Sequence, residues 1–306
     1  MKYLLKGLLK WLLPKKIYKL LANGAIVVPR YYSHHIEELE EHFNITLQSC
    51  DKKDVMLMRK YAHIIDKGLH RRDACSGHSR VYYEDLMGLI ERLSDTEYAQ
   101  DPTLKWAKEK ISQYELLQNE GVKFTPLEGS ASYNADISFT QLVELIKFRR
   151  SNRYFKEELI NDEIINNLKE LMNWAANSCN KQAVECFVTN DPVHASKCLK
   201  CCAGGTGFSK FIPSFWCFTA NVRGYVWPSE LYLPAIDVSL GAQNLFLGAT
   251  TLGISGTILS WAQHTKQDDD TLRELLNIPC DHTIVFCAVL GYAEYEYSTP
   301  ARKLTK

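Results

Sequence analysis

Three apolar runs in the second half of the chain constrain its fold more than any other feature. The runs are residues 185–189, 214–220 and 283–290. The last run contains no charged residue and ends at Gly291. Short apolar runs of this kind are typical of strands buried inside a domain. The stretches between them have helical spacing, so the second half predicts an α+β layer fold.

The predicted helices of this half have recognisable starts. Ser138 and Gln141 have the spacing of a capping box, which opens a helix that continues past Ile146. A second helix is expected from Asn161 or Asp162 to Ala176. Further helices are expected at residues 191–203, 236–252 and 271–276.

The first part of the chain has a different character. Apolar residues recur at helical spacing between about residues 34 and 119, and residues 121–136 are rich in Gly, Ser, Pro and Asn. We therefore expect four parts in order along the chain. They are a basic amphipathic helix (1–22), a helical region (23–120), a linker (121–137) and the α+β domain (138–306).

Residues 1–21 carry six lysines and no acidic residue, with leucines between them. No apolar run there approaches the roughly 20 residues that a spanning helix needs. The pattern indicates a helix on an anionic membrane surface, with Trp11 at the interface. The alternative is a helix packed on its own protein or on a dimer partner.

Charge and cysteine content exclude some classes. The chain has 36 acidic and 36 basic residues, which argues against nucleic-acid binding through an overall positive field. The ten cysteines are scattered along a long chain, as expected for reduced, mostly buried thiols in the cytoplasm. Cys198, Cys201 and Cys202 cluster on an expected helix, but a zinc site needs about four ligands, so we predict no metal.

An unusual polar segment follows the first helix of the α+β domain. Arg149, Arg150, Ser151 and Arg153 place three guanidinium groups and a hydroxyl within five residues. Guanidinium groups bind two phosphate oxygens at once, so this cluster predicts a site for a multiply charged, oxygen-rich anion.

Three further segments suit the same kind of ligand. Asn180 and Gln182 could offer donors and acceptors to a planar heterocycle. Ser255 and Gly256 follow the long helix, where backbone could approach a flat ring. Arg302 adds late positive charge. Each segment alone has an ordinary explanation as a turn or a helix cap.

In this order and spacing the segments resemble the flavin-dependent nitroreductase family. The resemblance covers Phe139 to Lys306 and includes Arg-Arg-Ser-x-Arg, the Asn-x-Gln loop, a strand ending in Thr-Ala-Asn, Gln-Asn-Leu in the long helix, and Leu-Gly-Tyr near the end. The sequence departs from the family pattern at Ala176 and Ala183, where prolines are usual, at Val184, which replaces a common aromatic residue, and at Ser255, where some members carry an acid.

The resemblance implies a three-layer fold with a central, mostly antiparallel sheet flanked by helices. It implies FMN as cofactor, NAD(P)H as co-substrate, and a homodimer with FMN at its interface. Arg149, Ser151 and Arg153, with Arg150 beside them, would hold the phosphate, ribityl chain and pyrimidine edge. Arg302 would reach the phosphate. Asn180 would bond to the ring edge with support from Gln182, and the backbone of Ser255 and Gly256 would face the ring.

The expected activity is a ping-pong transfer of a hydride from NAD(P)H through FMN to a small nitroaromatic, quinone or enone acceptor. Arg153 would stabilise reduced flavin, as the residue expected deepest in the cluster. The alternative is a non-catalytic flavin-fold scaffold in a membrane-associated assembly, such as one for polysaccharide biosynthesis. The expected location is cytoplasmic, with or without contact to the inner face of the membrane.

Overall fold

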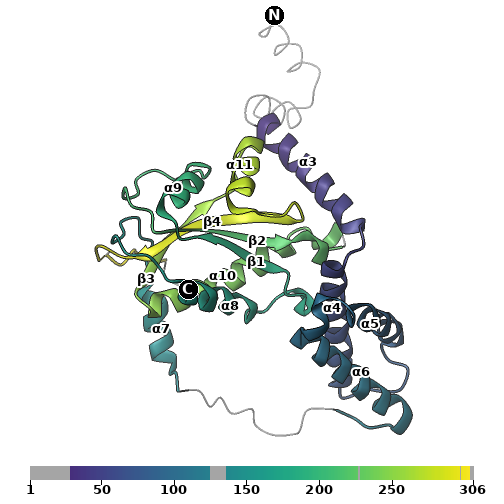
Figure 1. Ribbon diagram of the computed structural model, residues 1–306. Coiled ribbons are helices and arrows are strands. Elements are labelled where there is room, and N and C mark those ends of the chain that lie inside the picture. Colours follow the sequence, from purple (N-terminus) through teal and green to yellow (C-terminus); the bar gives the residue numbers. More distant parts are fainter. Residues whose placement is uncertain (1–27, 125–135, 227, 297, 304–306) are drawn as a thin grey trace, which may run out of the picture.

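The computed structural model describes residues 28–124, 136–226, 228–296 and 298–303 (Figure 1). The amphipathic helix expected at residues 1–22 and most of the expected linker lie outside the described residues. Both therefore stay predictions.

A four-stranded sheet forms the centre of the α+β part. Its strands are β1 (Val184–Thr189), β2 (Ser214–Asn221), β3 (Ile254–Ser260) and β4 (His282–Tyr292). Their order is β1-β2-β4-β3, and all neighbouring strands run antiparallel. β2 is buried along all its residues, as the apolar run predicted. β3 was not predicted, because its first residues were interpreted as the segment where the long helix ends.

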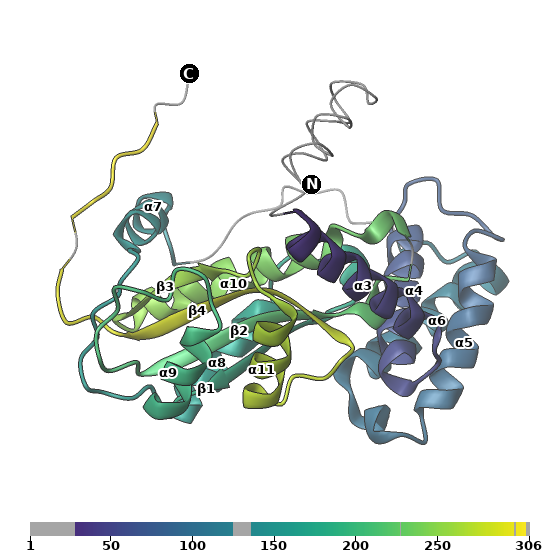
Figure 2. The same cartoon turned by 90° about the horizontal axis from the view of Figure 1, so that it is seen from above.

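Helices cover both faces of this sheet (Figures 1 and 2). They are α8 (Asp162–Asn173), α9 (Pro192–Lys200), α10 (Leu233–Thr251) and α11 (Lys266–Leu276). A further helix, α7 (Phe139–Phe148), contacts α10. Phe215 and Cys217 of β2 share a core cluster with residues of α9 and α11. Trp216 and Phe218 alternate with them and share the opposite core with α8 and α10. The predicted three-layer α+β fold with an antiparallel sheet is confirmed.

Side-chain caps explain where the helices begin. At α7, the Ser138 hydroxyl accepts from Gln141 N, and the Gln141 side chain accepts from Ser138 N, as the capping box predicted. At α8, Asn161 Oδ1 accepts from Ile164 N at 2.8 Å. Thr265 and Asp268 form a capping box that starts α11 earlier than its apolar pattern suggested.

The helical region contains α3 (Val28–Leu47), α4 (Asp51–Leu69), α5 (Arg80–Leu93) and α6 (Pro102–Glu120). Buried residues of α4, α5 and α6, such as Met58, Leu86 and Leu104, belong to the same core cluster as α8 and α10. In Figure 2 these helices lie at one end of the sheet, and α7 lies at the other. Within the described residues, no helix is both long enough and apolar enough to span a membrane.

The cysteines are all free, and six of the ten are buried. Burial raises the pKa of the Cys198 thiol to about 12 and that of Cys201 to about 11, so both stay protonated and unreactive. The described residues contain no group of ligands that could hold a metal ion.

His282 makes stability depend on pH. It is 1% exposed, and its Nδ1 lies 2.9 Å from Thr219 Oγ1. Burial lowers the pKa of His282 to about 4; Asp281 opposes this shift, and the positive charges of Lys52 and Arg273 add to it. An unfolded histidine has a pKa of about 6.5, so between these values the unfolded chain binds the additional proton.

We therefore expect the contribution of neutral His282 to the free energy of unfolding to be complete above about pH 6.5. It should fall by up to about 3 kcal/mol as the pH drops towards 4. Urea unfolding at several pH values would measure it. His282→Gln should flatten the slope in this window, and an unchanged slope would refute the assignment.

Candidate functional site

The arginine-rich loop that follows α7 lies against β3. Asn152 N donates to Gly256 O at 3.3 Å, and Thr257 Oγ1 donates to Asn152 O at 2.7 Å. A Cβ at Gly256 would lie 2.1 Å from Val289 O, so only glycine lets β3 pass here. The fold thus brings the segment 149–153 together with the predicted residues Ser255 and Gly256.

Three arginines of the predicted site lie close together. Arg149 is the C-cap of α7 and is half-buried. Burial lowers the pKa of Arg149, and the positive charges of Arg302 and Arg150 lower it further, because like charges disfavour protonation. Arg150 Nη2 donates to Thr299 Oγ1 at 2.6 Å, so the C-terminal segment lies beside the loop. We call Arg149, Arg150 and Arg302 the arginine cluster.

Ser151 and Arg153 are exposed, whereas Arg149 and Arg150 of the arginine cluster are half-buried. The Arg153 guanidinium lies 6.0 Å from the centre of the Phe208 ring, and its carbonyl accepts from Ser209 N at 2.9 Å. The expectation that Arg153 lies deepest among these arginines is therefore wrong for the single chain: Arg149 and Arg150 are half-buried, and Arg153 is exposed.

Buried polar atoms without hydrogen-bond partners lie in this loop and on β3 beside it. Among the described residues, Arg150 Nε, Asn152 Nδ2 and Ser255 Oγ are buried and lack a hydrogen bond. Such atoms are costly unless a ligand or another chain satisfies them. Asn152 is fully buried and connects the loop to β3, yet sequence reasoning missed it. The sequence signal that could have identified Asn152 is its position between Ser151 and Arg153 in the arginine-rich motif.

The second predicted loop carries Asn180 and Gln182. Cys179, Asn180 and Gln182 have positive φ angles of 53°, 54° and 53°, which non-glycine residues rarely adopt. Gln182 Nε2 donates to Asn180 Oδ1 at 3.2 Å, and Gln182 N donates to Asn177 Oδ1 at 3.0 Å. The support expected from Gln182 is thus a direct hydrogen bond to Asn180. We call residues 177–182 the amide loop.

A buried carboxylate fixes the start of the amide loop. Asp237 of α10 accepts from Ser178 N at 3.0 Å and from Ser178 Oγ at 2.9 Å. Its other oxygen accepts from the Tyr225 hydroxyl at 2.8 Å. Burial raises the pKa of Tyr225, so this hydroxyl stays a donor. Asp237 therefore ties the amide loop to the central helix of the domain.

The two predicted parts of the site lie at opposite ends of the sheet. Asn221 N donates to Ala183 O, so the amide loop adjoins the last residue of β2. Gly256 pairs with Leu290, which pairs with Ser214, the first residue of β2. A strand of this length spans roughly 23 Å, at about 3.3 Å per residue. One chain alone does not bring Asn180 to the arginine cluster.

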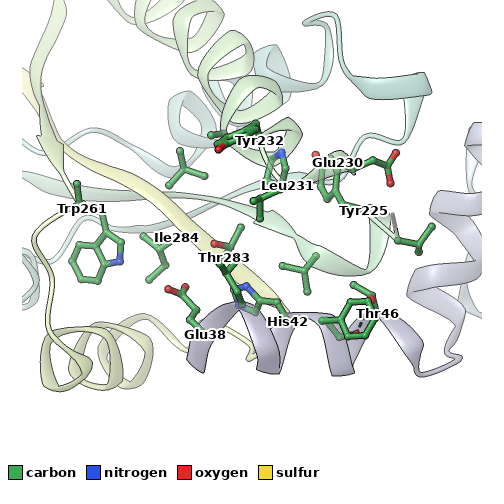
Figure 3. A pocket seen from close by; sticks show the side chains of 18 of the residues that line it. Glu38, His42, Thr46, Tyr225, Glu230, Leu231, Tyr232, Trp261, Thr283 and Ile284 are labelled. Carbon is green, nitrogen blue, oxygen red and sulfur yellow. Dashed lines mark hydrogen bonds between the residues drawn. The ribbon is translucent and has the colours of Figure 1, made fainter. Parts of the chain in front are cut away.

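A pocket of about 810 Å³ opens beside the amide-loop end of the sheet (Figure 3). β3 ends at Ser260, opposite Phe286, so residues 283–285 of β4 have no β3 neighbour, and these residues line the pocket. In Figure 3, Glu38 and His42 of α3 lie on one side, and Leu231 and Tyr232 lie on the other. Its lining comes from distant segments, which is why sequence reasoning missed it.

This pocket is mostly apolar and adjoins the amide loop. Its walls include Leu39, Phe43, Trp261 and Val285, and burial lowers the pKa of His42. Tyr225 and Glu230 also line it. Tyr225 bonds Asp237, and Glu230 pairs with Lys181 Nζ at 2.5 Å, so both take part in holding the amide loop.

Comparisons with known proteins agree with the motifs. The model of the Nitroreductase family matches residues 146–207. The chain resembles an FMN-dependent nitroreductase from Clostridium difficile (21% identity, 52% of this chain and 91% of that chain, TM-score 0.46). It also resembles an NADPH:FMN oxidoreductase from Vibrio harveyi (19%, 52% and 72%, 0.45) and the NfrA1 nitroreductase from B. subtilis (21%, 52% and 69%, 0.46).

The search among curated proteins finds no match. The resemblance to the nitroreductase family is confirmed by its model over residues 146–207, which include the whole arginine-rich loop and the whole amide loop.

Proposed function

We propose that the protein is an FMN-dependent oxidoreductase. One observation carries the proposal. The arginine cluster gathers three positive charges beside three buried polar atoms that lack partners, at the loop matched by the nitroreductase model. Like charges held this close favour a counter-anion, and the phosphate of FMN is a dianion with several acceptor oxygens.

The residues present fit this cofactor. Arg149 and Arg302 would hold the phosphate, and Arg150 would support them from its bond to Thr299. Asn152 Nδ2 and Ser255 Oγ would donate to polar atoms of the ribityl chain or ring. Ser151 and Arg153, which are exposed in the single chain, remain proposed contacts that need the ligand or a second chain to cover them.

A second copy of the chain would complete the site, because Asn180 and Gln182 lie too far from the arginine cluster of their own chain. Exposed apolar residues support such a dimer. α7 has no buried residue, and Phe139 of that helix is 81% exposed. Trp174 and Tyr232 are 78% and 75% exposed. An apolar surface of this kind is typical of a protein interface.

The chemistry that FMN would supply, held by these residues, is hydride transfer from NAD(P)H to an organic acceptor in a ping-pong cycle. The chain would supply position and charge: guanidinium groups fix the phosphate, and the amide loop of the second copy would bond to the ring edge. The pocket in Figure 3 suits an aromatic acceptor in its size and apolar lining.

The purified protein tests this function. We expect a yellow protein of twice the 35.1 kDa chain mass in light scattering, with an absorption band that NADPH or NADH bleaches and an added quinone restores. A colourless monomer that does not bind added FMN would contradict the proposal and favour the scaffold alternative.

A further inference from the structure

We infer that α4 positions the amide loop for contact with the flavin ring, through Arg59 and Lys60. This role would explain why the helical region packs against an oxidoreductase domain. The inferred contact with the flavin ring rests on the proposed function. The contacts between α4 and the amide loop do not depend on any cofactor.

Arg59 makes a direct contact between α4 and the amide loop. Its Nη1 donates to Lys181 O, near the end of the amide loop, at 3.4 Å. Its other nitrogens are fixed from behind: Nη2 pairs with Asp101 at 2.7 Å, and Nε donates to Thr103 Oγ1 at 3.0 Å. Asp101 is the N-cap of α6, so two helices set the direction of this guanidinium.

Lys60 makes a second, indirect connection. Its Nζ lies 4.0 Å from Glu230 Oε1, which also pairs with Nζ of Lys181. Lys181 is 1% exposed, and its ammonium lies 4.8 Å from the centre of the Tyr225 ring. Burial lowers the pKa of Lys60, and Glu230 opposes that shift. Of these two adjacent residues of α4, Arg59 thus contacts the backbone of Lys181, and Lys60 shares the Glu230 carboxylate with the Lys181 side chain.

The amide loop needs such outside contacts. Its three positive φ angles are unfavourable for non-glycine residues and persist only when surrounding contacts impose them. Packing at the base of the loop is also tight. A Cβ at Gly224 would lie 3.0 Å from both Met56 Sδ of α4 and Ala183 Cβ. α4 therefore packs against both the amide loop and the turn at residues 222–224 that follows β2.

Hydrogen exchange in the flavin-free protein tests the positioning role directly. Arg59→Ala should speed exchange across residues 178–183 about tenfold, the factor that corresponds to one modest charge-assisted hydrogen bond. Arg59→Lys keeps a cation beside Asp101 but cannot also reach Lys181 O. We expect it to speed exchange similarly while the melting temperature stays near that of the parent. FMN should bind about tenfold more weakly to both variants.

Arg92→Ala is the matched control, because Arg92 pairs with Asp54 of α4 at 2.9 Å and makes no contact with the loop. It should leave exchange at 178–183 and FMN affinity unchanged. The inference is overturned if the Arg59→Lys variant shows parent-like exchange and affinity. If Arg59→Ala fails to fold, the lysine variant decides alone. Faster exchange in a protein that never binds FMN would support the positioning role and contradict the proposed function.

Discussion

Arg149→Glu should weaken FMN binding by more than about 100-fold, because it replaces a charge-assisted phosphate contact with repulsion in a half-buried site. Arg149 shares its surroundings with Arg302 and Arg150, so the reversal also cancels part of their field. Calorimetric titration of the flavin-free protein with FMN would measure the loss. Arg80→Glu is a suitable control, since Arg80 is an exposed residue of α5 that pairs only with Glu84 among the described ion pairs.

Riboflavin sharpens this test because it lacks the phosphate. The parent protein should prefer FMN to riboflavin by about 100-fold or more, and Arg149→Glu should remove most of that preference. Equal loss of affinity for both ligands would show that Arg149 does not contact the phosphate.

Asp237→Ala should destabilise the protein by about 3–5 kcal/mol, the largest effect that we expect from a single substitution on folding. The Asp237 side chain is buried and accepts from Ser178 N, Ser178 Oγ and the Tyr225 hydroxyl. Removal leaves three donors without this acceptor, one on buried Tyr225 and two on half-buried Ser178, and an unsatisfied donor costs about 1–3 kcal/mol when it is buried. Urea unfolding would give the change in free energy.

An exposed carboxylate provides the comparison. Asp270 pairs with Lys266 at 3.2 Å on the surface of α11, and Asp270→Ala should change stability by less than about 1 kcal/mol. Asp237→Asn keeps the shape and should cost less than the alanine variant. Similar values for Asp237→Ala and Asp270→Ala would mean that the buried network contributes little.

Much of the α+β part was predictable because its local sequence patterns favour the same strands and helices that packing in the folded domain requires. The strands β1, β2 and β4 form where apolar runs predicted them, and Ser138 and Asn161 cap helices where the sequence placed them. β2 and much of β4 are buried as expected, but β1 is an edge strand in which only Cys186 is buried. Arg150 bonds to Thr299, so the C-terminal segment lies beside the arginine-rich loop, and the contact of Arg302 with a phosphate stays a prediction.

The remaining features depend on contacts between distant segments. β3 contains Ser255 and Gly256 and its Ile258 is exposed, so the apolar pattern that marks a buried strand is weak there. The separation of Asn180 from Arg149 follows from strand register, which no single segment encodes. The contact between Arg59 and Lys181 joins positions 122 residues apart. The pocket beside α3 likewise depends on where β3 ends.

A crystal structure of the protein with FMN tests the central claim most directly. The account predicts the phosphate within hydrogen-bond distance of Arg149 and Arg302, and the amide loop of a second copy at the ring edge. Arginine side chains directed into solvent, with FMN absent or bound elsewhere at saturating concentration, would contradict it.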